Sequence, residues 1–309
     1  MELTFSYIIP CYYNEPNIPV TFSRLLENEK LFGDEVAFEY VFVDDGSKDN
    51  TWAELQKIHS RHPEKVRLIR FGKNVGSYIA ITAGMKKASG DINVVVSADL
   101  QDPVELTFEM FKYWKNGFKL VIGQRANNMD GFVSKRTSKL FNSLMRKYAI
   151  SDLPKGGFDF VLFDKIVKEQ VLLTGEKNTN ILYLMFILGY PTATIPYVRE
   201  ERKLGKSRWT FKKKMKLFID SFIAFSFVPI RILSVTGLVF GFLSLVYSIY
   251  ILINKLIGNI EIEGWSALMI TVLFIGSFQM IGLGILGEYL WRVLDEVRNR
   301  PQYTIIDEH

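Results

Sequence analysis

Two polar residues, Asp99 and Gln101, closely follow an apolar run that is typical of a buried strand. The run, Val94–Val96, consists of β-branched residues, and Pro103 comes where a helix could begin. In an open α/β sheet, ligands bind beyond the carboxyl ends of the strands. Carboxylate and amide oxygens suit a hard cation that bridges a diphosphate. We therefore expect Asp99 and Gln101 to hold Mg²⁺ or Mn²⁺, although an ordinary strand-to-turn junction uses the same residue types.

The elements that would position these residues alternate between strands and helices. The sequence predicts strands over residues 6–10, 39–47 with its closing turn, 66–71, 92–97 and 120–123. It predicts the intervening helices over residues 18–30, 51–61, 75–88 and 104–115. This alternation favours a parallel, doubly wound α/β sheet over roughly the first 125 residues.

Polar residues follow four of these strands, and the carboxyl ends of parallel strands share one edge of the sheet. Taken singly, such residues are more often turn or cap residues, and only their joint placement favours a site. A nucleotide needs carboxylates for its base and ribose, a metal for its diphosphate and a ring for stacking. Glycine-rich phosphate loops are absent, which disfavours a dinucleotide or ATP site. The expected set is Pro10, Tyr12, Asn14, Glu15, Asp44, Asp45, Ser97, Asp99, Gln101 and Arg125.

Composition excludes several other classes of site. The single cysteine, Cys11, rules out an intramolecular disulfide, and three histidines are too few and too scattered for a zinc site or a Ser-His-Asp triad. The net charge of +5 does not predict nucleic-acid binding, because the basic residues concentrate beside apolar segments.

Two charge-free runs, residues 232–254 and 264–287, are each longer than the about 20 residues that cross a bilayer as a helix. They predict two transmembrane helices. Before them, residues 209–227 combine an apolar stripe with a lysine cluster at 212–216, which indicates a helix lying in the membrane interface. A helix packed on the globular domain would show a similar stripe.

The charges that flank the two runs predict the orientation. Lysines and arginines precede the first run and follow the second, whereas the connecting loop has one lysine and two glutamates. The positive-inside rule then places both termini and the α/β domain in the cytoplasm. The Gly237-x-x-x-Gly241 pattern would permit close packing of the two helices or a homo-oligomer.

Several motifs together resemble glycosyltransferase family 2, whose members have the nucleotide-sugar-binding GT-A fold. The resemblance is closest to its polyprenyl-phosphate glycosyltransferase branch, which includes bactoprenol-phosphate glycosyltransferases and dolichol-phosphate mannose synthase. It covers nearly the whole chain. The motifs are Pro10–Glu15 (Pro-Cys-Tyr-Tyr-Asn-Glu), Val43–Ser47 (Val-Asp-Asp-Gly-Ser), Ala98–Pro103 (Ala-Asp-Leu-Gln-Asp-Pro), Gly123–Arg125, Gly157–Phe158 and Arg202–Arg208 (Arg-Lys-Leu-Gly-Lys-Ser-Arg).

The resemblance implies an inverting, metal-dependent transfer of one sugar from a nucleotide sugar, such as UDP-glucose or UDP-N-acetylglucosamine, to undecaprenyl phosphate in a bacterial inner membrane. It implies that Arg125 and Arg136 lie near the acceptor phosphate. Arg202, Ser207 and Arg208 would close over the donor phosphates. The expected domains are the GT-A domain over 1–208, an amphipathic helix over 209–230, the two spans over 231–290 and a cytosolic tail over 291–309.

Three departures from the family pattern stand out. Ser97 replaces the first acid of the usual Asp-Ala-Asp, and it supplies no charge to a metal. Asp159 stands where the family commonly has an arginine, which reverses a charge in the acceptor region. Arg208 replaces a lysine, which keeps the charge and changes its geometry.

Two other functions remain open. Ser97 would also suit a catalytically weak or inactive membrane protein of the same fold. A processive polysaccharide synthase shares the first motifs, but such enzymes typically carry Gln-x-x-Arg-Trp, and here Arg208-Trp209 lacks the glutamine.

Overall fold

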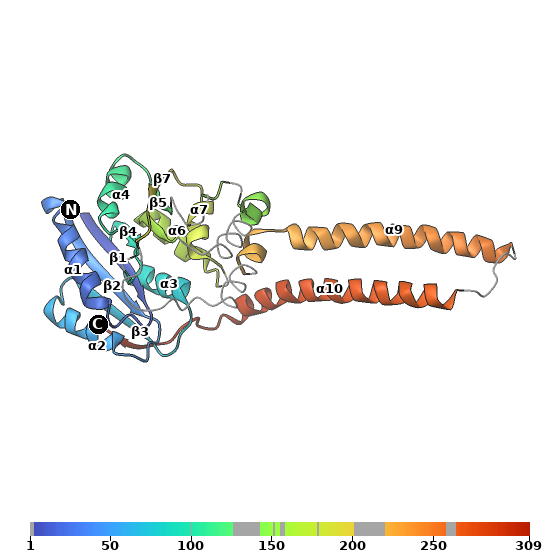
Figure 1. Ribbon diagram of the computed structural model, residues 1–309, viewed down its shortest axis with the longest axis horizontal. Coiled ribbons are helices and arrows are strands. Elements are labelled where there is room, and N and C mark those ends of the chain that lie inside the picture. The colour runs from blue at the N-terminus through green and yellow to red at the C-terminus, as the bar shows by residue number, and fades with distance from the viewer. Residues whose placement is uncertain are drawn as a thin grey trace. The chain divides into compact units, whose positions relative to one another are not determined.

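The computed structural model describes residues 3–99, 101–125, 143–150, 152–154, 158–177, 179–200, 220–257 and 264–309. These residues belong to two units. The first consists of residues 1–221 together with 301–309, and the second of residues 222–300. The first unit carries the sheet, and the second carries two long helices (Figure 1).

The strands and helices predicted within the first 125 residues are all present, and their bounds differ from the expected ones by a few residues. The strands of the first unit are β1 (Leu3–Cys11), β2 (Val36–Asp44), β3 (Val66–Phe71), β4 (Ile92–Val95), β5 (Leu120–Arg125), β6 (Phe160–Asp164), β7 (Thr192–Tyr197) and β8 (Ile305–Glu308). Its helices include α1 (Ile18–Glu29), η1 (Gly33–Glu35), α2 (Thr51–Arg61), α3 (Ser77–Lys87), α4 (Leu106–Lys115), α6 (Lys165–Thr174) and α7 (Ile181–Ile187).

The strands form one mixed sheet in the order β7-β5-β6-β4-β1-β2-β3-β8. β1 pairs in parallel with β2 and β4, and β2 pairs in parallel with β3. β6 runs antiparallel between β4 and β5, and β5 pairs in parallel with β7. The carboxyl ends of β1, β2, β4, β5 and β7 therefore meet at one edge. This confirms the mostly parallel α/β arrangement, and it places the predicted polar residues on that edge.

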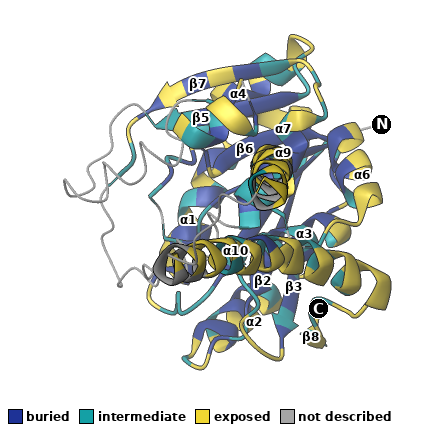
Figure 2. Ribbon diagram, turned by 90° about the vertical axis from the view of Figure 1, so that its right-hand side faces the viewer, coloured by how far each residue is buried: buried dark blue, intermediate teal, exposed yellow. Residues whose placement is uncertain are grey.

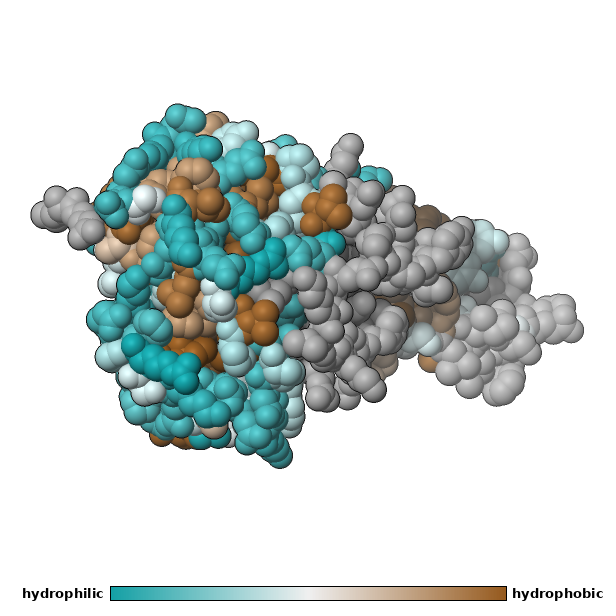
Figure 3. All heavy atoms as spheres, turned by 60° about the vertical axis from the view of Figure 1, so that its left-hand side comes forward, coloured by the Kyte–Doolittle hydropathy of each residue, from teal (hydrophilic) through white to brown (hydrophobic). Residues whose placement is uncertain are grey.

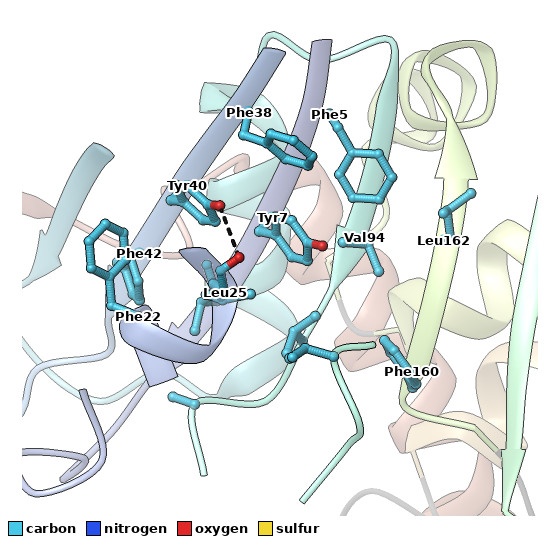
Figure 4. Packing of buried hydrophobic residues seen from close by; sticks show 14 of the residues in the cluster. Phe5, Tyr7, Phe22, Leu25, Phe38, Tyr40, Phe42, Val94, Phe160 and Leu162 are labelled. Atoms are coloured by element: carbon cyan, nitrogen blue, oxygen red, sulfur yellow. Dashed lines mark hydrogen bonds between the residues drawn. The ribbon is translucent and has the colours of Figure 1, made fainter. Parts of the chain in front are cut away.

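Side chains of β1 alternate between the two faces of the sheet, as the period of a strand requires. Phe5, Tyr7 and Ile9 join a buried cluster with α1, α2 and α4, including Phe22 and Leu25 (Figure 4). The intervening Ile8 lies on the opposite face, where it approaches Gly84 of α3. Helices thus cover both faces, and the central strands are largely buried (Figure 2). On the face that Figure 3 shows, the first unit presents mainly hydrophilic side chains with scattered apolar ones.

The residues of the expected tail, 291–309, include the end of a long helix and an edge strand. α10 (Trp265–Arg298) continues to Arg298, and β8 then pairs antiparallel with β3. Tyr303 stacks on Phe71 at 4.7 Å, and the backbones of Leu68 and His309 exchange hydrogen bonds of 2.9 and 3.0 Å. An edge strand leaves backbone groups without partners, so a following segment that covers it stabilises the sheet. The sequence did not predict this strand, because its pairing with β3 joins segments that are far apart in the chain.

The second unit is a pair of helices, α9 (Val228–Leu256) and α10. Phe240 contacts Phe274 and Phe278 with ring centroids 5.8 and 5.4 Å apart, and Leu233 packs against Gly282. Large apolar side chains such as Leu238 and Val297 are exposed in both helices.

Among the residues that the structure describes, no helix is both long enough and apolar enough to cross a membrane. The two spans therefore stay a prediction from the sequence. The expected interfacial helix falls largely on residues 209–219, which lie outside the described residues, and residues 220–225 are helical.

We expect Gly84→Ala to destabilise the first unit, although alanine favours a helix by about 1 kcal/mol over glycine. The added methyl would lie 2.5 Å from Ile8 Cγ2 and 3.3 Å from Val43 Cγ2, so α3 would have to move away from β1 and β2. The free energy of unfolding, measured by denaturant titration, should fall by about 1–3 kcal/mol. A gain in stability would contradict the close approach of α3 to the sheet.

Candidate active site

The loop after β1 is held in shape by Asn14. Its Oδ1 accepts a hydrogen bond from the backbone N–H of Tyr12 at 2.8 Å, and its own N–H donates to Thr51 Oγ1 at 2.9 Å. The intervening Tyr13 has a positive φ of 56° and donates its N–H to Ser47 Oγ at 3.0 Å. A positive φ is unfavourable for tyrosine. These bonds therefore fix a strained turn that presents Tyr12 and Tyr13 at the edge of the sheet.

Two further predicted residues, Glu15 and Pro10, lie in or beside this loop. Glu15 accepts hydrogen bonds from the backbone and side-chain nitrogens of Asn50 at 3.1 and 3.0 Å, just before α2. Pro10 lies within β1, where it is in register with Val43. Glu15 therefore joins the first loop to the second.

The adjacent carboxylates Asp44 and Asp45 have different surroundings. Asp45 accepts three hydrogen bonds, from Asn74 Nδ2 at 2.6 Å, Val75 N at 2.7 Å and Gly76 N at 2.9 Å. These donors precede α3, so Asp45 fixes the start of that helix.

Asp44 is fully buried, and only one of its oxygens is satisfied. Oδ1 accepts the N–H of Ser47 at 3.0 Å, whereas Oδ2 has no hydrogen-bond partner among the described residues. Arg70 Nε lies 3.7 Å from Oδ2, which is an ion-pair contact and too long for a hydrogen bond. Burial raises the pKa of Asp44, and Ser47 and Arg70 offset part of that rise. A buried acceptor without a donor, at the ligand edge of the sheet, suits an N–H or O–H group of a ligand.

In the loop after β4, the side chain of Ser97 is bound to Asp102. Ser97 Oγ donates to Asp102 Oδ2 at 2.7 Å, and the hydroxyl of Tyr197 donates to Asp102 Oδ1 at 2.7 Å. Asp102 is 1% exposed, and Arg199 Nε lies 3.9 Å from it. Ser97 therefore helps to hold a buried carboxylate, and an aspartate at position 97 would place a second negative charge against Asp102.

Asp99 and Gln101 are half-buried in the same loop. The N–H of Gln101 approaches Asp99 Oδ1 at 3.3 Å, and Gln101 Nε2 donates to the carbonyl of Glu200 at 3.4 Å. The N–H of Glu200 donates in return to the carbonyl of Gln101 at 2.9 Å. The loop is thus paired with the segment after β7.

The donor set at Asp99 suits a metal that is shared with a substrate. Within the described residues, no group of three histidine, cysteine, aspartate or glutamate side chains could hold a metal ion. Mg²⁺ is commonly bound by one or two carboxylates together with substrate phosphates. Asp99, with Gln101 beside it, fits a cation completed by a diphosphate and does not fit a protein-only cage.

Arg24 of α1 forms ion pairs next to the loop after β4. Its guanidinium contacts Glu105 at 2.8 and 3.0 Å and Glu200 at 2.6 and 3.2 Å. Glu105 follows the loop in sequence, and Glu200 pairs with Gln101. The Arg24 side chain therefore connects the residue that follows the candidate metal loop with the segment after β7 that pairs with this loop.

Arg125, the last residue of β5, forms an ion pair with Asp159 through Nη2. Arg125 is in register with Tyr197 of β7, which in turn binds Asp102. Burial alone would lower the pKa of Arg125, but Asp159 and Tyr197 raise it, so the guanidinium stays charged. Ser97, Asp102, Tyr197, Arg125 and Asp159 thus form one continuous chain of contacts.

The other predicted site residues fall outside the described residues. These are Arg136, Arg202, Ser207 and Arg208. The described part of the edge brings together the remaining predicted residues on the ends of β1, β2, β4 and β5.

Residues 6–172 match Glycosyl transferase family 2. The chain belongs to this family. It is 32% identical over 308 residues to the SfII prophage-derived bactoprenol glucosyl transferase of Shigella flexneri, with 99% of each chain covered. It is 34% identical over 305 residues to YkcC of Bacillus subtilis, an uncharacterized glycosyltransferase, with 98% of this chain and 94% of YkcC covered.

Solved structures are more distant. The mannosyltransferase PcManGT from Pyrobaculum calidifontis, in complex with GDP-Man and Mn²⁺, is 19% identical with a TM-score of 0.47, covering 67% of this chain and 59% of that one. The family match shows that the chain is a glycosyltransferase, and its α/β sheet agrees with the GT-A-like fold of this family.

Three contributors to the site of this glycosyltransferase escaped the sequence analysis. Asp102 lies in the same motif as Asp99, and its place before a proline was a signal that could have found it. Tyr197 and Arg24 gave no local signal, because their partners are 81 to 176 residues away in the chain.

We expect Asp44→Asn to stabilise the glycosyltransferase at neutral pH and to weaken donor binding. The pKa of Asp44 is higher in the folded protein than its unfolded value of about 3.9. The native protein therefore loses stability as the pH rises from the unfolded-state pKa through the folded-state pKa. Asparagine does not ionise. The free energy of unfolding of the variant should therefore exceed that of the native protein by about 1 kcal/mol at pH 7 and equal it at pH 3.5. Thermal unfolding at the two pH values measures this.

The neighbouring Asp45→Asn is the matched control. Its carboxylate is satisfied by three donors, so this change should lower stability at pH 7 by about 1–3 kcal/mol. Equal destabilisation by both changes would contradict the assignment of Asp44 to a ligand.

Proposed function

We propose that this glycosyltransferase transfers one sugar, with inversion, from a UDP-sugar to a polyprenyl phosphate. The sugar is glucose or N-acetylglucosamine, and the product is a lipid-linked monosaccharide for modification of the cell envelope. The observation that carries the proposal is the series of contacts that links Ser97 to Asp159 through Asp102, Tyr197 and Arg125. It joins the candidate metal loop after β4 to the arginine that suits a phosphate acceptor.

The donor side of the proposal rests on two carboxylates that follow the strands on either side of β1. Asp44 Oδ2 offers a buried acceptor for an N–H or O–H group of the nucleoside. Asp99 lies at the end of β4, and β1 separates its strand from β2. Tyr12 and Tyr13 lie on the loop between them and offer rings for stacking with a base.

The acceptor side rests on Arg125. A guanidinium binds phosphate oxygens well, and this one is held in place by its ion pair with Asp159 and by Tyr197. The names of full-length relatives, which are bactoprenol glucosyl transferases of Shigella flexneri and its phages, support a polyprenyl phosphate acceptor.

The reaction is one displacement at the anomeric carbon of the sugar. An oxygen of the acceptor phosphate attacks that carbon from the face opposite to UDP, and the bond to the donor phosphate breaks as UDP leaves with the electron pair. The acceptor phosphate is largely ionised at pH 7, since its second pKa is about 6 by analogy with phosphorylated side chains. No side chain has to remove a proton, so the work of the protein is to position the two substrates and stabilise charge.

Asp99 and Gln101 would hold Mg²⁺ or Mn²⁺ against the donor diphosphate. A bound divalent cation supplies a Lewis acid that stabilises the leaving group.

We also propose that the chain resides in the cytoplasmic membrane of a bacterium, with its catalytic unit and both termini in the cytoplasm. The charge-free runs of the printed sequence within α9 and α10, their exposed apolar side chains and the flanking basic residues support this. Packing through Gly237 and Gly241 would also suit a homo-oligomer.

A donor panel tests the proposed reaction. Purified protein in detergent receives undecaprenyl phosphate, Mg²⁺ or Mn²⁺ and labelled UDP-glucose, UDP-N-acetylglucosamine, UDP-galactose or GDP-mannose. We expect one UDP-hexose to give a solvent-extractable lipid-linked monosaccharide, and EDTA to abolish it. Arg125→Ala should lower the rate about 100-fold while UDP binding persists, because it removes charge stabilisation at the acceptor.

The control is Asp34→Asn, an exposed acid in η1, which should leave the rate unchanged. A polymeric product would favour a processive synthase. A folded protein that binds UDP and gives no product with any donor would favour an inactive relative.

A further inference from the structure

The two side chains of the ion pair between Arg125 and Asp159 differ in their exposure to solvent. The Arg125 side chain is 17% exposed, whereas that of Asp159 is 54% exposed. The guanidinium is held at the end of β5, and the carboxylate precedes β6 and borders solvent. Asp159 can therefore move away into water at little cost, whereas Arg125 has no such freedom.

Asp159 satisfies only part of the guanidinium edge that it faces. It binds Nη2, and Nε of Arg125 is buried without a hydrogen-bond partner among the described residues. Nε and Nη2 lie on the same side of an arginine and together form a two-donor edge that suits a carboxylate or phosphate. The present pair therefore leaves one donor of that edge unused.

The surroundings of Asp159 are aromatic. Burial raises the pKa of Tyr78 and of Tyr183, and the negative charge of Asp159 raises both further. Asn180 Nδ2 donates to the hydroxyl of Tyr78 at 3.1 Å, and Phe158 lies beside Tyr183 with ring centroids 5.7 Å apart. These phenols stay neutral, so they do not compete with Asp159 for the guanidinium, and their hydroxyls could donate to a phosphate.

We propose that Asp159 is the resting counter-ion of Arg125 and that the phosphate of the lipid acceptor displaces it, binding Nε and Nη2 together. This inference rests on the proposed function, in which Arg125 receives the acceptor. Asp159 then determines acceptor specificity, because a weakly charged headgroup does not displace a carboxylate, whereas a phosphate monoester with two charges and three oxygens does.

The test compares Asp159→Asn with the native protein. We expect the acceptor KM to fall about fivefold, because the amide has no charge to be displaced, and the donor KM to stay the same. If Asp159 served only to hold Arg125 in place, its loss would raise the acceptor KM or lower kcat alone.

A binding measurement separates this inference from the proposed reaction. Titration calorimetry with farnesyl monophosphate, without donor, should show about fivefold tighter binding to Asp159→Asn and no binding to Arg125→Ala. Asp34→Asn is the matched control and should bind as the native protein does. Asp159→Ala is a second variant that should behave as Asp159→Asn does, and UDP binding by each variant reports that it is folded.

Unchanged or weaker binding of farnesyl monophosphate to both Asp159 variants would overturn the inference, even if sugar transfer is observed. Tighter binding would support it, even if the donor panel gives no product.

Discussion

The buried carboxylate of Asp102 is the constraint on which the candidate site depends. Burying a carboxyl group to 1% exposure is costly unless its oxygens are hydrogen-bonded, and here they are bonded by the hydroxyls of Ser97 and Tyr197. These partners come from the loop after β4 and from the end of β7. These two hydroxyls therefore fix the loop after β4 relative to the end of β7, where Tyr197 is in register with Arg125.

The same constraint changes the interpretation of Ser97. The family pattern places an acid at this position, and from the sequence alone Ser97 only removes a charge from the expected metal site. In the structure, the hydroxyl has a partner of its own in Asp102. An acid there would face a buried carboxylate, so the serine is consistent with the rest of this loop, and Asp99 is left as the carboxylate of the proposed metal site.

The carboxylates of the edge differ in what satisfies them, although sequence makes them look alike. Asp45 is bound by three donors and fixes α3, whereas one oxygen of the adjacent Asp44 has no donor within the described part of the chain. Asp159 pairs with a cation at the surface. The same residue type therefore stabilises the fold in one place and is left for a ligand in another, according to its neighbours.

The parallel strands and the polar residues at their ends could be predicted from sequence, because strand periodicity and the position of strand ends are local properties. The antiparallel β6 between β4 and β5 and the edge strand β8 could not, because their pairing joins segments that are far apart in the chain. The ion pair between Arg24 and Glu200 could not be predicted for the same reason, because the two residues are 176 positions apart. The charge reversal at Asp159 was visible in the sequence, but its partner Arg125 was not.

The most direct test of the account is the metal dependence of UDP binding at the end of β4. Titration of UDP into the native protein, Asp99→Asn and Asp34→Asn, each with Mg²⁺ and with EDTA, measures it. The account predicts that Mg²⁺ strengthens UDP binding to the native protein and to Asp34→Asn, and that Asp99→Asn loses this gain, about tenfold or more. Equal strengthening by Mg²⁺ in Asp99→Asn would contradict the placement of the donor diphosphate at this edge of the sheet.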